Sequence, residues 1–420
     1  MKVLLCGADG FLGRAIAGAL EAAGHRVLRG VHHPRLAGDV AIDYQTDLSP
    51  EVSLPRLAGV DVVINAIGIL RERQPGDFER IHHRAPAALF AACAAAGVGR
   101  VIQISALGGE FQGEPPPYLA SKHAADKALW QSLPDRGVVL RPGLVFGRDG
   151  ASTRFFLALA SLPLHADPAG AGAVQPVHVD DVASAVLRLV EGAVVPSCLL
   201  ELPGPRRLSY AGWLASYRAG LGLPPALSLP LPGFLMAASA RLAGLFPTSL
   251  LTADTWAMLK AGNTADPGPA RGLLGHPLKA PDEFIAPDEA EALRLRALAA
   301  WRRPMLRVVL ATIWLITALL SFGVYPVESS LALLAPFGIS GTLALALLYG
   351  ASLLDLAMAG LTVWRPGRRL WLAQLALMAG YTVLIAWKLP EFLLHPFGPI
   401  LKNLAVAALL FILYAEEDKS

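Results

Sequence analysis

The chain has 420 residues, a formal net charge of +3 and 16% charged residues. This length allows two or three domains, and so mild a charge argues against nucleic acid as a partner. The mean hydropathy of +0.48 is high for a wholly soluble enzyme, and the excess lies in long apolar stretches beyond Pro304. Cys6, Cys93 and Cys198 have neither disulfide nor metal-ligand spacing, which favours a reducing compartment and predicts no metal site.

A glycine-rich turn follows the first apolar run of the chain. Val3 to Cys6 is typical of a buried parallel strand, and Arg14 to Ala23 has helical periodicity. A strand, a glycine turn and a helix in this order predict a dinucleotide site, although small glycine-rich turns are frequent and this spacing is GxxGxxG. The residues predicted to hold the cofactor here are Gly7, Asp9, Gly10, Phe11, Leu12 and Gly13.

The end of the second predicted strand bears on the choice of nicotinamide cofactor. An NAD site usually carries an acidic residue there, which bonds the ribose hydroxyls. The strand from Arg26 to Val31 is instead followed by His32, His33 and Arg35, with Arg29 nearby. We therefore favour NADP(H) over NAD(H), with His32 and Arg35 as contacts; the alternative is that these are solvated loop residues.

The third and fourth predicted strands end in further cofactor residues. Val40 to Ile42 leads into Asp43 and Tyr44, where a carboxylate can accept a hydrogen bond from the adenine amino group; Asp47 is the alternative. The fourth strand, Val60 to Ile64, leads into small residues, as expected where a cofactor crosses the sheet. Those residues are Asn65, Ala66, Ile67 and Gly68.

The stretch from Pro115 to Lys122 carries the predicted chemistry. Its prolines suit the start of a helix, and Tyr118 and Lys122 lie four residues apart on one face of that helix. A free phenol has a pKa of about 10, and a neighbouring ammonium would lower the pKa of Tyr118. Ser105, after the fifth strand, is placed to hold a substrate carbonyl. The alternative is an ordinary exposed helix.

Several separated motifs together resemble the extended or atypical short-chain dehydrogenase/reductases. They are Gly7–Gly13, Asn65–Gly68, Ser105, Tyr118–Lys122, Leu140–Gly147 and Val177–Ala183. The resemblance covers roughly residues 1 to 300 and implies an α/β fold: a Rossmann-type doubly wound parallel sheet with a small substrate cap, supplied mainly by residues 150–300. Within the family, the chain is most similar to the branch that contains the Rossmann-type accessory subunit of respiratory complex I.

This resemblance implies a role for individual residues. Tyr118 would be the proton donor, Ser105 the carbonyl anchor and Lys122 a cofactor ligand. Pro142 and Gly143 would lie beside the nicotinamide.

The sequence departs from the family at two places. His32 stands where many relatives carry arginine after the second strand, which weakens the preference for NADP(H). His82 and His83 stand where other members often carry asparagine in the middle helix, so the route of the proton stays open.

Two later stretches bear on the cap. Leu229 to Phe246 is strongly apolar and has two interpretations: a patch that lies against a bilayer, or the apolar core of the cap. Ala265 to Pro287 is rich in proline and glycine, as a linker would be.

Residues 304–415 predict an all-α domain of four transmembrane helices. Each of four apolar segments is close to the roughly 20 residues that cross a bilayer. They are Met305–Tyr325, Gly341–Trp364, Leu370–Leu389 and Pro399–Tyr414. Arginines next to the first span and after the second place the Rossmann part on the cytoplasmic side of the inner membrane, and no secretory signal is visible.

This membrane part resembles the DoxX-like proteins in the stretches Ser352–Ala357 and Pro396–Asn403. Asp355 lies in the middle of a span, where a carboxyl is costly unless it is paired or faces a cavity. Tyr381, His395 and Lys402 are candidate partners. The alternative is a polar contact between helices.

These features predict a membrane-anchored NAD(P)H-dependent oxidoreductase. Its reaction would be hydride transfer to or from a carbonyl or alcohol of an apolar substrate, such as a quinone or an isoprenoid, taken from the lipid bilayer. One alternative is a non-catalytic NADP(H)-binding regulatory or assembly protein of a membrane respiratory complex. Another is a membrane domain with its own activity and a Rossmann domain that senses redox state.

Overall fold

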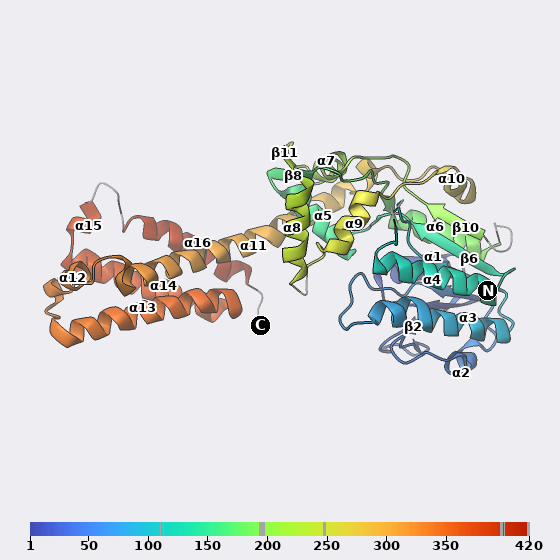
Figure 1. Cartoon of the computed structure of the whole chain (residues 1–420), viewed down its shortest axis with the longest axis horizontal. Coiled ribbons are helices and arrows are strands. Elements are labelled where there is room, and N and C mark those ends of the chain that lie inside the picture. Colours follow the sequence, from blue (N-terminus) through green and yellow to red (C-terminus); the bar gives the residue numbers. More distant parts are fainter. Residues whose placement is uncertain are drawn as a thin grey trace. The chain divides into compact units, whose positions relative to one another are not determined.

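The computed structural model describes residues 1–109, 111, 113–192, 198–246, 249–394, 398 and 400–417. The chain divides into two compact units, Met1–Ala297 and Leu298–Ser420. The first contains a parallel sheet with helices on both faces and a smaller cap, and the second is helical (Figure 1).

A seven-stranded parallel sheet is the centre of the first unit. In spatial order its strands are β10 (Cys198–Leu202), β6 (Gly137–Pro142), β5 (Arg100–Ile104), β4 (Val62–Asn65), β1 (Lys2–Cys6), β2 (Arg26–Val31) and β3 (Val40–Ala41). The strand order reverses at β1, which pairs with β2 on one side and with β4 on the other. Ligands of doubly wound sheets bind outside the carboxyl ends of the strands at such a point. The predicted Rossmann-type fold is confirmed.

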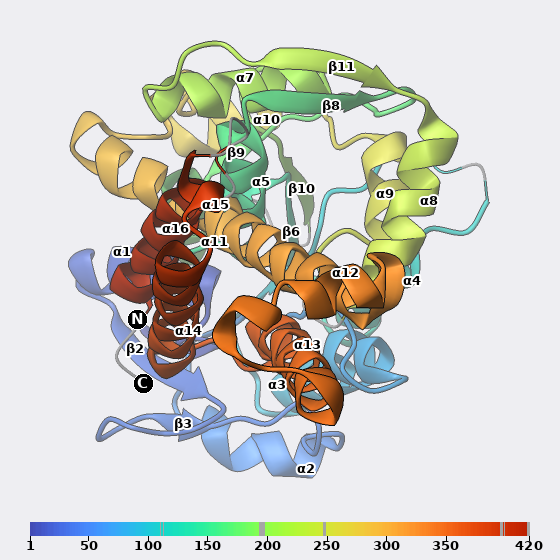
Figure 2. The same ribbon diagram turned by 90° about the vertical axis from the view of Figure 1, so that its left-hand side faces the viewer.

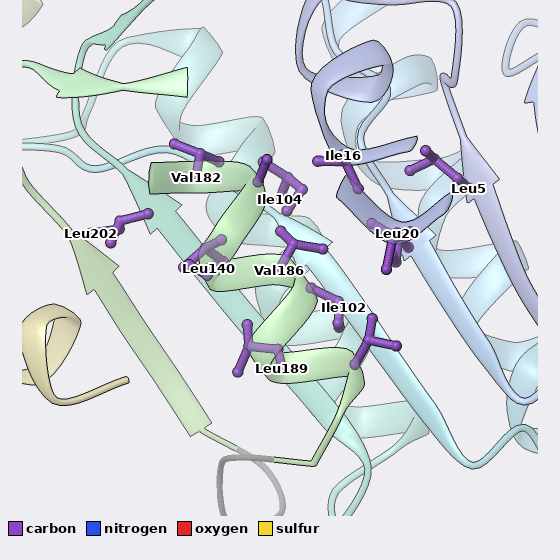
Figure 3. Close-up of a cluster of buried hydrophobic side chains, with 14 of the residues drawn as sticks. Leu5, Ile16, Leu20, Ile102, Ile104, Leu140, Val182, Val186, Leu189 and Leu202 are labelled. Atoms are coloured by element: carbon purple, nitrogen blue, oxygen red, sulfur yellow. The ribbon is translucent and has the colours of Figure 1, made fainter. Parts of the chain in front are cut away.

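Both faces of this sheet are buried. Leu5 of β1 belongs to a cluster on one face and Leu4 to a cluster on the other, which is why the strand is a continuous apolar run. Figure 3 shows the first cluster, in which side chains of two helices cover Ile102 and Ile104. The helices are α1 (Phe11–Ala22), α6 (Val179–Val190) and α10 (Gly268–Leu274) on that face, and α2 (Pro50–Ser53), η1 (Leu54–Leu57), α3 (Ala85–Ala95) and α4 (Pro117–Ser132) on the other.

The cap has its own aromatic core. Trp213 and Tyr217 of α7 lie edge to face, and Phe146 contacts both Tyr217 and Phe284. The cap elements are β7 (Val145–Phe146), α5 (Ala151–Ser161), β8 (Leu164–Pro168), β9 (Val177–His178), α7 (Tyr210–Gly220), β11 (Leu227–Leu231), α8 (Gly233–Gly244), α9 (Ala253–Ala261) and η3 (Pro281–Glu283). β11 pairs with β8, and α8 lies beside α9 (Figure 2).

The apolar stretch Leu229–Phe246 is not the core of the cap. On α8 the one buried residue is Ala240, whereas Phe234 and Leu242 are 72% and 65% exposed. The interpretation of this stretch as a buried cap core is therefore wrong for α8, because the cap core is built from α5 and α7 instead.

The second unit consists of helices. They are α11 (Pro287–Leu319, which begins in the first unit), η4 (Leu320–Val324), α12 (Val327–Ala332), η5 (Ala335–Phe337), α13 (Gly341–Trp364), α14 (Arg368–Lys388), α15 (Glu391–Leu394) and α16 (Lys402–Glu416). Among the described residues, three helices are long and apolar enough to cross a membrane: Pro287–Val324, Gly341–Trp364 and Arg368–Lys388. The fourth predicted span contains α16, whose 15 residues fall short of the roughly 20 that a bilayer needs, so a fourth crossing stays a prediction.

Polar side chains lie between these helices. Trp314 donates to Gln374, and Gln374 donates to Thr362, at 2.9 and 2.8 Å. Asp355 is 3% exposed and has a carboxylate oxygen without a hydrogen-bond partner among the described residues. Of its three predicted partners, His395 lies outside the described residues, and a pairing with Tyr381 or Lys402 stays a prediction.

Candidate active site

The glycine turn between β1 and α1 leaves no room for side chains. Gly7 has a φ of +85°, and its N–H donates to the Gly30 carbonyl at 2.8 Å. A Cβ on Gly13 would lie 1.9 Å from the Gly7 carbonyl oxygen, so only glycine allows α1 to pack this closely. Gly10 is the N-cap of α1 and has no side chain, which leaves the first N–H groups of the helix to an anion. This cradle fits a dinucleotide pyrophosphate.

The other residues predicted in this turn surround the cradle. Asp9 is exposed, and its carbonyl accepts from Arg14. Leu12 packs against the sheet. The Phe11 ring lies so close to Gly147 that a Cβ there would be 2.6 Å from it. Phe11 thereby ties the turn to the segment after β6.

A buried amide network forms the end of β4. Asn65 accepts hydrogen bonds from the Tyr44 hydroxyl at 2.8 Å and from the Ile67 N–H at 3.3 Å, and it donates to Gln103 at 2.7 Å. These bonds fix the backbone at Ala66 and Ile67 directly above Gly7. The Tyr44 side chain is buried, and its hydroxyl is bonded to Asn65. A cofactor contact from this residue would therefore have to come from its backbone.

The loop after β2 is polar and exposed. His32 lies 3.5 Å from the Asp43 carboxylate and 2.9 Å from His33. Asp39 accepts a hydrogen bond from the backbone N–H of Arg35 and pairs with Arg29, and the Arg35 side chain is exposed. The alternative adenine contact, Asp47, is buried in an ion pair with Arg56.

Lys122 lies under the carboxyl ends of β4 and β5. Its ammonium donates to the carbonyls of Ile67 and Ile104, both at 3.3 Å, and it is 5% exposed. A Cβ on Gly68 would lie 3.0 Å from the Lys122 nitrogen. Burial lowers the pKa of Lys122 to about 8, against the opposing charge of Asp126.

Tyr118 is held among aromatic rings. Phe78 and His82 pack edge to face against it, with ring centroids 5.9 and 5.5 Å away. Burial raises the pKa of Tyr118 to about 12. The expectation that Lys122 lowers this pKa is therefore wrong in this structure, because the ammonium is bound to two backbone carbonyls and desolvation of the phenol dominates.

His82 connects these groups. It lies in the π-helix η2 (Glu79–Arg84), and one ring nitrogen accepts from the Ile69 N–H at 3.0 Å. The other donates to Ser121, whose hydroxyl donates to the Tyr118 carbonyl. Burial and the charge of Lys122 hold the pKa of His82 far below its ordinary value, so the ring is neutral. It acts as a fixed bridge between the loop after β4 and the start of α4.

Ser105 is hydrogen-bonded to a buried ion pair. Its hydroxyl donates to Asp126 at 2.9 Å, and Asp126 is fully buried and paired with Arg141 at 2.8 Å. This arrangement assigns Ser105 to a structural network between β5, α4 and β6. It gives no support to the predicted role of carbonyl anchor. No sequence pattern indicated this ion pair, because Asp126 and Arg141 are 15 residues apart.

An apolar cavity of about 370 Å³ lies beside these residues. Leu107, Gly108 and Gly109, directly after β5, form one wall, together with Leu119, the neighbour of Tyr118. Leu70, Arg71 and Leu144 also line it, and the cap supplies most of the rest, including Phe155, Phe156, Leu159, Met236, Trp256 and Leu259. Such a cavity suits an apolar ligand.

Asn263 joins the cap to the predicted nicotinamide segment. Its side chain accepts from the Leu144 N–H at 2.9 Å and donates to the Leu107 carbonyl at 2.7 Å. The Leu107 N–H in turn donates to the Pro142 carbonyl, and a Cβ on Gly143 would lie 3.0 Å from Asn263. Pro142 and Gly143 are thus fixed at the edge of the cavity. No sequence motif pointed to Asn263.

Two families match the chain. Residues 3–196 match the NAD dependent epimerase/dehydratase family, and residues 311–411 match the DoxX-like family.

Three relatives match the first unit. A 3-diazoavenalumate denitrifying reductase of a Streptomyces species is 31% identical over 300 residues, which cover 63% of this chain and 94% of that protein. A ceramide reductase of Caulobacter vibrioides is 32% identical over 248 residues, which cover 56% and 75% of the two chains. The mitochondrial NADH dehydrogenase (ubiquinone) 1 alpha subcomplex subunit 9 of Rattus norvegicus is 30% identical over 258 residues, which cover 57% and 66%.

Solved structures agree on the fold. A human epimerase family protein solved with NADPH has a TM-score of 0.52 and 19% identity, with 71% of this chain and 99% of that chain covered. These similarities confirm the resemblances inferred from the motifs of both units.

Proposed function

We propose that this chain, which belongs to the NAD-dependent epimerase/dehydratase family and carries a DoxX-like C-terminal domain, is a membrane-anchored reductase of an apolar carbonyl compound or quinone. The observation that carries the proposal is the apolar cavity that begins at Leu119, one residue from Tyr118. A relative that is named a ceramide reductase supports an apolar substrate class.

The predicted cofactor residues fit a nicotinamide dinucleotide. Gly7, Gly10 and Gly13 would receive the pyrophosphate, and Lys122 the ribose hydroxyls near Gly68. When bound, the nicotinamide would supply the hydride. NADP(H) is the preferred form in this proposal, because Arg35 is exposed after β2 and the nearby acid, Asp39, is paired with Arg29.

The chemistry of the chain itself favours reduction over oxidation. Because burial raises the pKa of Tyr118 to about 12, this phenol carries its proton at neutral pH. A protonated phenol can donate to a developing alkoxide, whereas oxidation of an alcohol would need the phenolate as a base.

The membrane location follows from the second unit. Three long apolar helices and the DoxX-like domain support a membrane protein. We propose the inner membrane, with the Rossmann domain on the cytoplasmic side, since Arg303 and Arg307 lie in α11 directly before its long apolar part.

The test is a substrate panel on the detergent-solubilised full chain. Absorbance of the reduced nicotinamide would be followed after addition of quinones, isoprenoid ketones or keto-sphingolipids, with nucleotide sugars as the polar control. We expect oxidation with one of the apolar classes and none with the nucleotide sugars. Oxidation by a nucleotide sugar alone would contradict the proposal.

A second function has its own support. One relative is a subunit of a respiratory NADH dehydrogenase, and the Ser105 hydroxyl donates to the buried carboxylate of Asp126. Both fit a protein that binds NADP(H) without turnover and assembles with a membrane redox complex. Bound cofactor that raises the unfolding temperature and is never oxidised by the panel would favour this function.

The charge of Lys122 predicts an alkaline limit for reduction. Since its pKa is about 8, Lys122 loses its proton above that pH, and kcat/KM should be level below pH 8 and fall above it. Lys122→Met should lower the kcat/KM measured below pH 8 roughly 100-fold and abolish the decrease above pH 8. Lys127 is an exposed lysine on the same helix, so Lys127→Met is the matched control. This variant should keep the wild-type kcat/KM below pH 8 and the decrease above it. A wild-type profile that stays level to pH 10 would show that the charge of Lys122 is not needed.

A further inference from the structure

An apolar face covers one side of the cap. It consists of Leu227, Leu229, Phe234, Leu242, Leu245 and Phe246, and we call it the cap face. Their exposed fractions run from 46% for Leu229 to 77% for Leu245. Surface leucines and phenylalanines are common singly, whereas these six exposed ones within residues 227–246, on one strand, one helix and the turn after it, are typical of a binding surface.

The charge pattern of this segment favours lipid over protein. Between residues 219 and 253 the only charged residue is Arg241, which is exposed on α8. Protein interfaces usually surround an apolar centre with a polar, charged rim. A surface with apolar side chains, no acid and one arginine suits the interfacial region of an anionic bilayer, where the guanidinium can reach the headgroups. Helices long enough to span a membrane in the same chain keep a bilayer within reach.

The same helix forms a wall of the cavity. Met236 and Ser239 of α8 line the cavity, while Phe234 and Leu242 of that helix are exposed. One helix therefore separates the apolar interior of the cap from the surroundings of the protein.

The end of α8 is fastened to the cofactor side of the first unit. Arg71 donates to the carbonyls of Gly244, Phe246 and Ser249, at 2.6, 2.8 and 3.0 Å. Arg71 follows Gly68 by three residues and also lines the cavity. These bonds satisfy carbonyls that the end of a helix leaves free, and they hold the cap face in a fixed position relative to the cavity.

We propose that the cap face inserts into the interfacial region of the lipid bilayer, and that the cavity takes its apolar ligand directly from there past α8. The entry of substrate rests on the proposed function, whereas contact with lipid does not. The two parts are therefore tested by separate measurements.

Lipid contact is measured with a fluorescent label on the full chain in vesicles of phosphatidylethanolamine and phosphatidylglycerol. The label is placed at Leu242→Cys or, as a matched control, at Val52→Cys on α2, which is 41% exposed. Protein without a new cysteine sets the background from the half-buried Cys198. Lipids with nitroxide groups on their acyl chains should quench the label at 242 strongly and the label at 52 little.

Two results of this measurement would overturn the proposal. Equal, weak quenching at both positions would place the cap face in water. A label at 242 that is shielded from water-soluble quenchers but not reached by the nitroxide lipids would mean that protein, such as a second copy of the chain, covers this face. Neither result depends on turnover, so a failure of the proposed function leaves this test intact.

Substrate entry is measured with Leu242→Asp. We expect the KM for a membrane-embedded substrate to rise about tenfold, because a carboxylate resists insertion at the interface, with kcat and cofactor affinity unchanged. The KM for a short-chain, water-soluble analogue of the same substrate should not move. Val52→Asp is the control for both. An equal rise for the two substrates would reject entry from the bilayer.

Discussion

Tyr118→Phe is expected to lower kcat for carbonyl reduction on the order of 100- to 10,000-fold, the usual contribution of a positioned proton donor. The phenylalanine ring keeps the edge-to-face contacts with Phe78 and His82 and removes only the hydroxyl. Cofactor affinity should therefore stay within a few fold of wild type. Stopped-flow absorbance of the reduced nicotinamide measures the first quantity, and cofactor titration measures the second.

Ser105→Ala is the informative comparison for that variant. If the Ser105 hydroxyl serves the ion pair of Asp126 and Arg141, its loss should cost about 1 to 2 kcal/mol of stability and leave kcat within a few fold. A loss in kcat as large as that of Tyr118→Phe, with normal stability, would restore Ser105 as the carbonyl anchor. Unchanged turnover in Tyr118→Phe would instead show that another group donates the proton.

The sequence predicted the parts of this fold that depend on local pattern. Apolar runs such as Val3–Cys6 were recognisable as strands because both faces of a parallel sheet are buried. The glycine turn was recognisable because Gly7 and Gly13 meet steric demands that no other residue satisfies.

Features that depend on packing between distant segments could not be predicted from local sequence patterns. Whether Ser105 points to a substrate or to Asp126 depends on how α4 lies against β5 and β6. The Tyr118 ring packs against Phe78, which is 40 residues away in the chain. Asn263 reaches Leu107 across 156 residues, and no periodicity or motif signals such a contact.

The apolar segments show the same difference between local properties, which the sequence predicts, and packing, which it does not. Length and hydropathy identified three helices that are long enough to span, because those properties are local. The exposure of Phe234 and Leu242 was undecided in the sequence, since an apolar helix has the same composition whether it faces a core or a bilayer.

Gly13→Ala is expected to abolish cofactor binding, with a rise in Kd of roughly 100-fold or more. The added Cβ would lie 1.9 Å from the Gly7 carbonyl oxygen and 2.9 Å from Ala8 Cα, both backbone atoms, so α1 must move away from β1 and the N–H groups at its start leave the pyrophosphate. Overpacking of this kind also costs about 1 to 3 kcal/mol of stability. Calorimetric titration with NADPH and thermal unfolding with and without it measure both effects.

Gly18→Ala, one turn and a half further along α1, is the matched control. A Cβ at Gly18 meets nothing within 4 Å, and the residue is exposed. Alanine is a better helix former than glycine, so this variant should gain about 0.5 to 1 kcal/mol and bind NADPH as wild type does. Because both substitutions add one methyl group to the same helix, a difference between them isolates the contact with the Gly7 turn. NADPH binding in Gly13→Ala that equals binding in Gly18→Ala would place the pyrophosphate elsewhere and remove the basis for the proposed cofactor site.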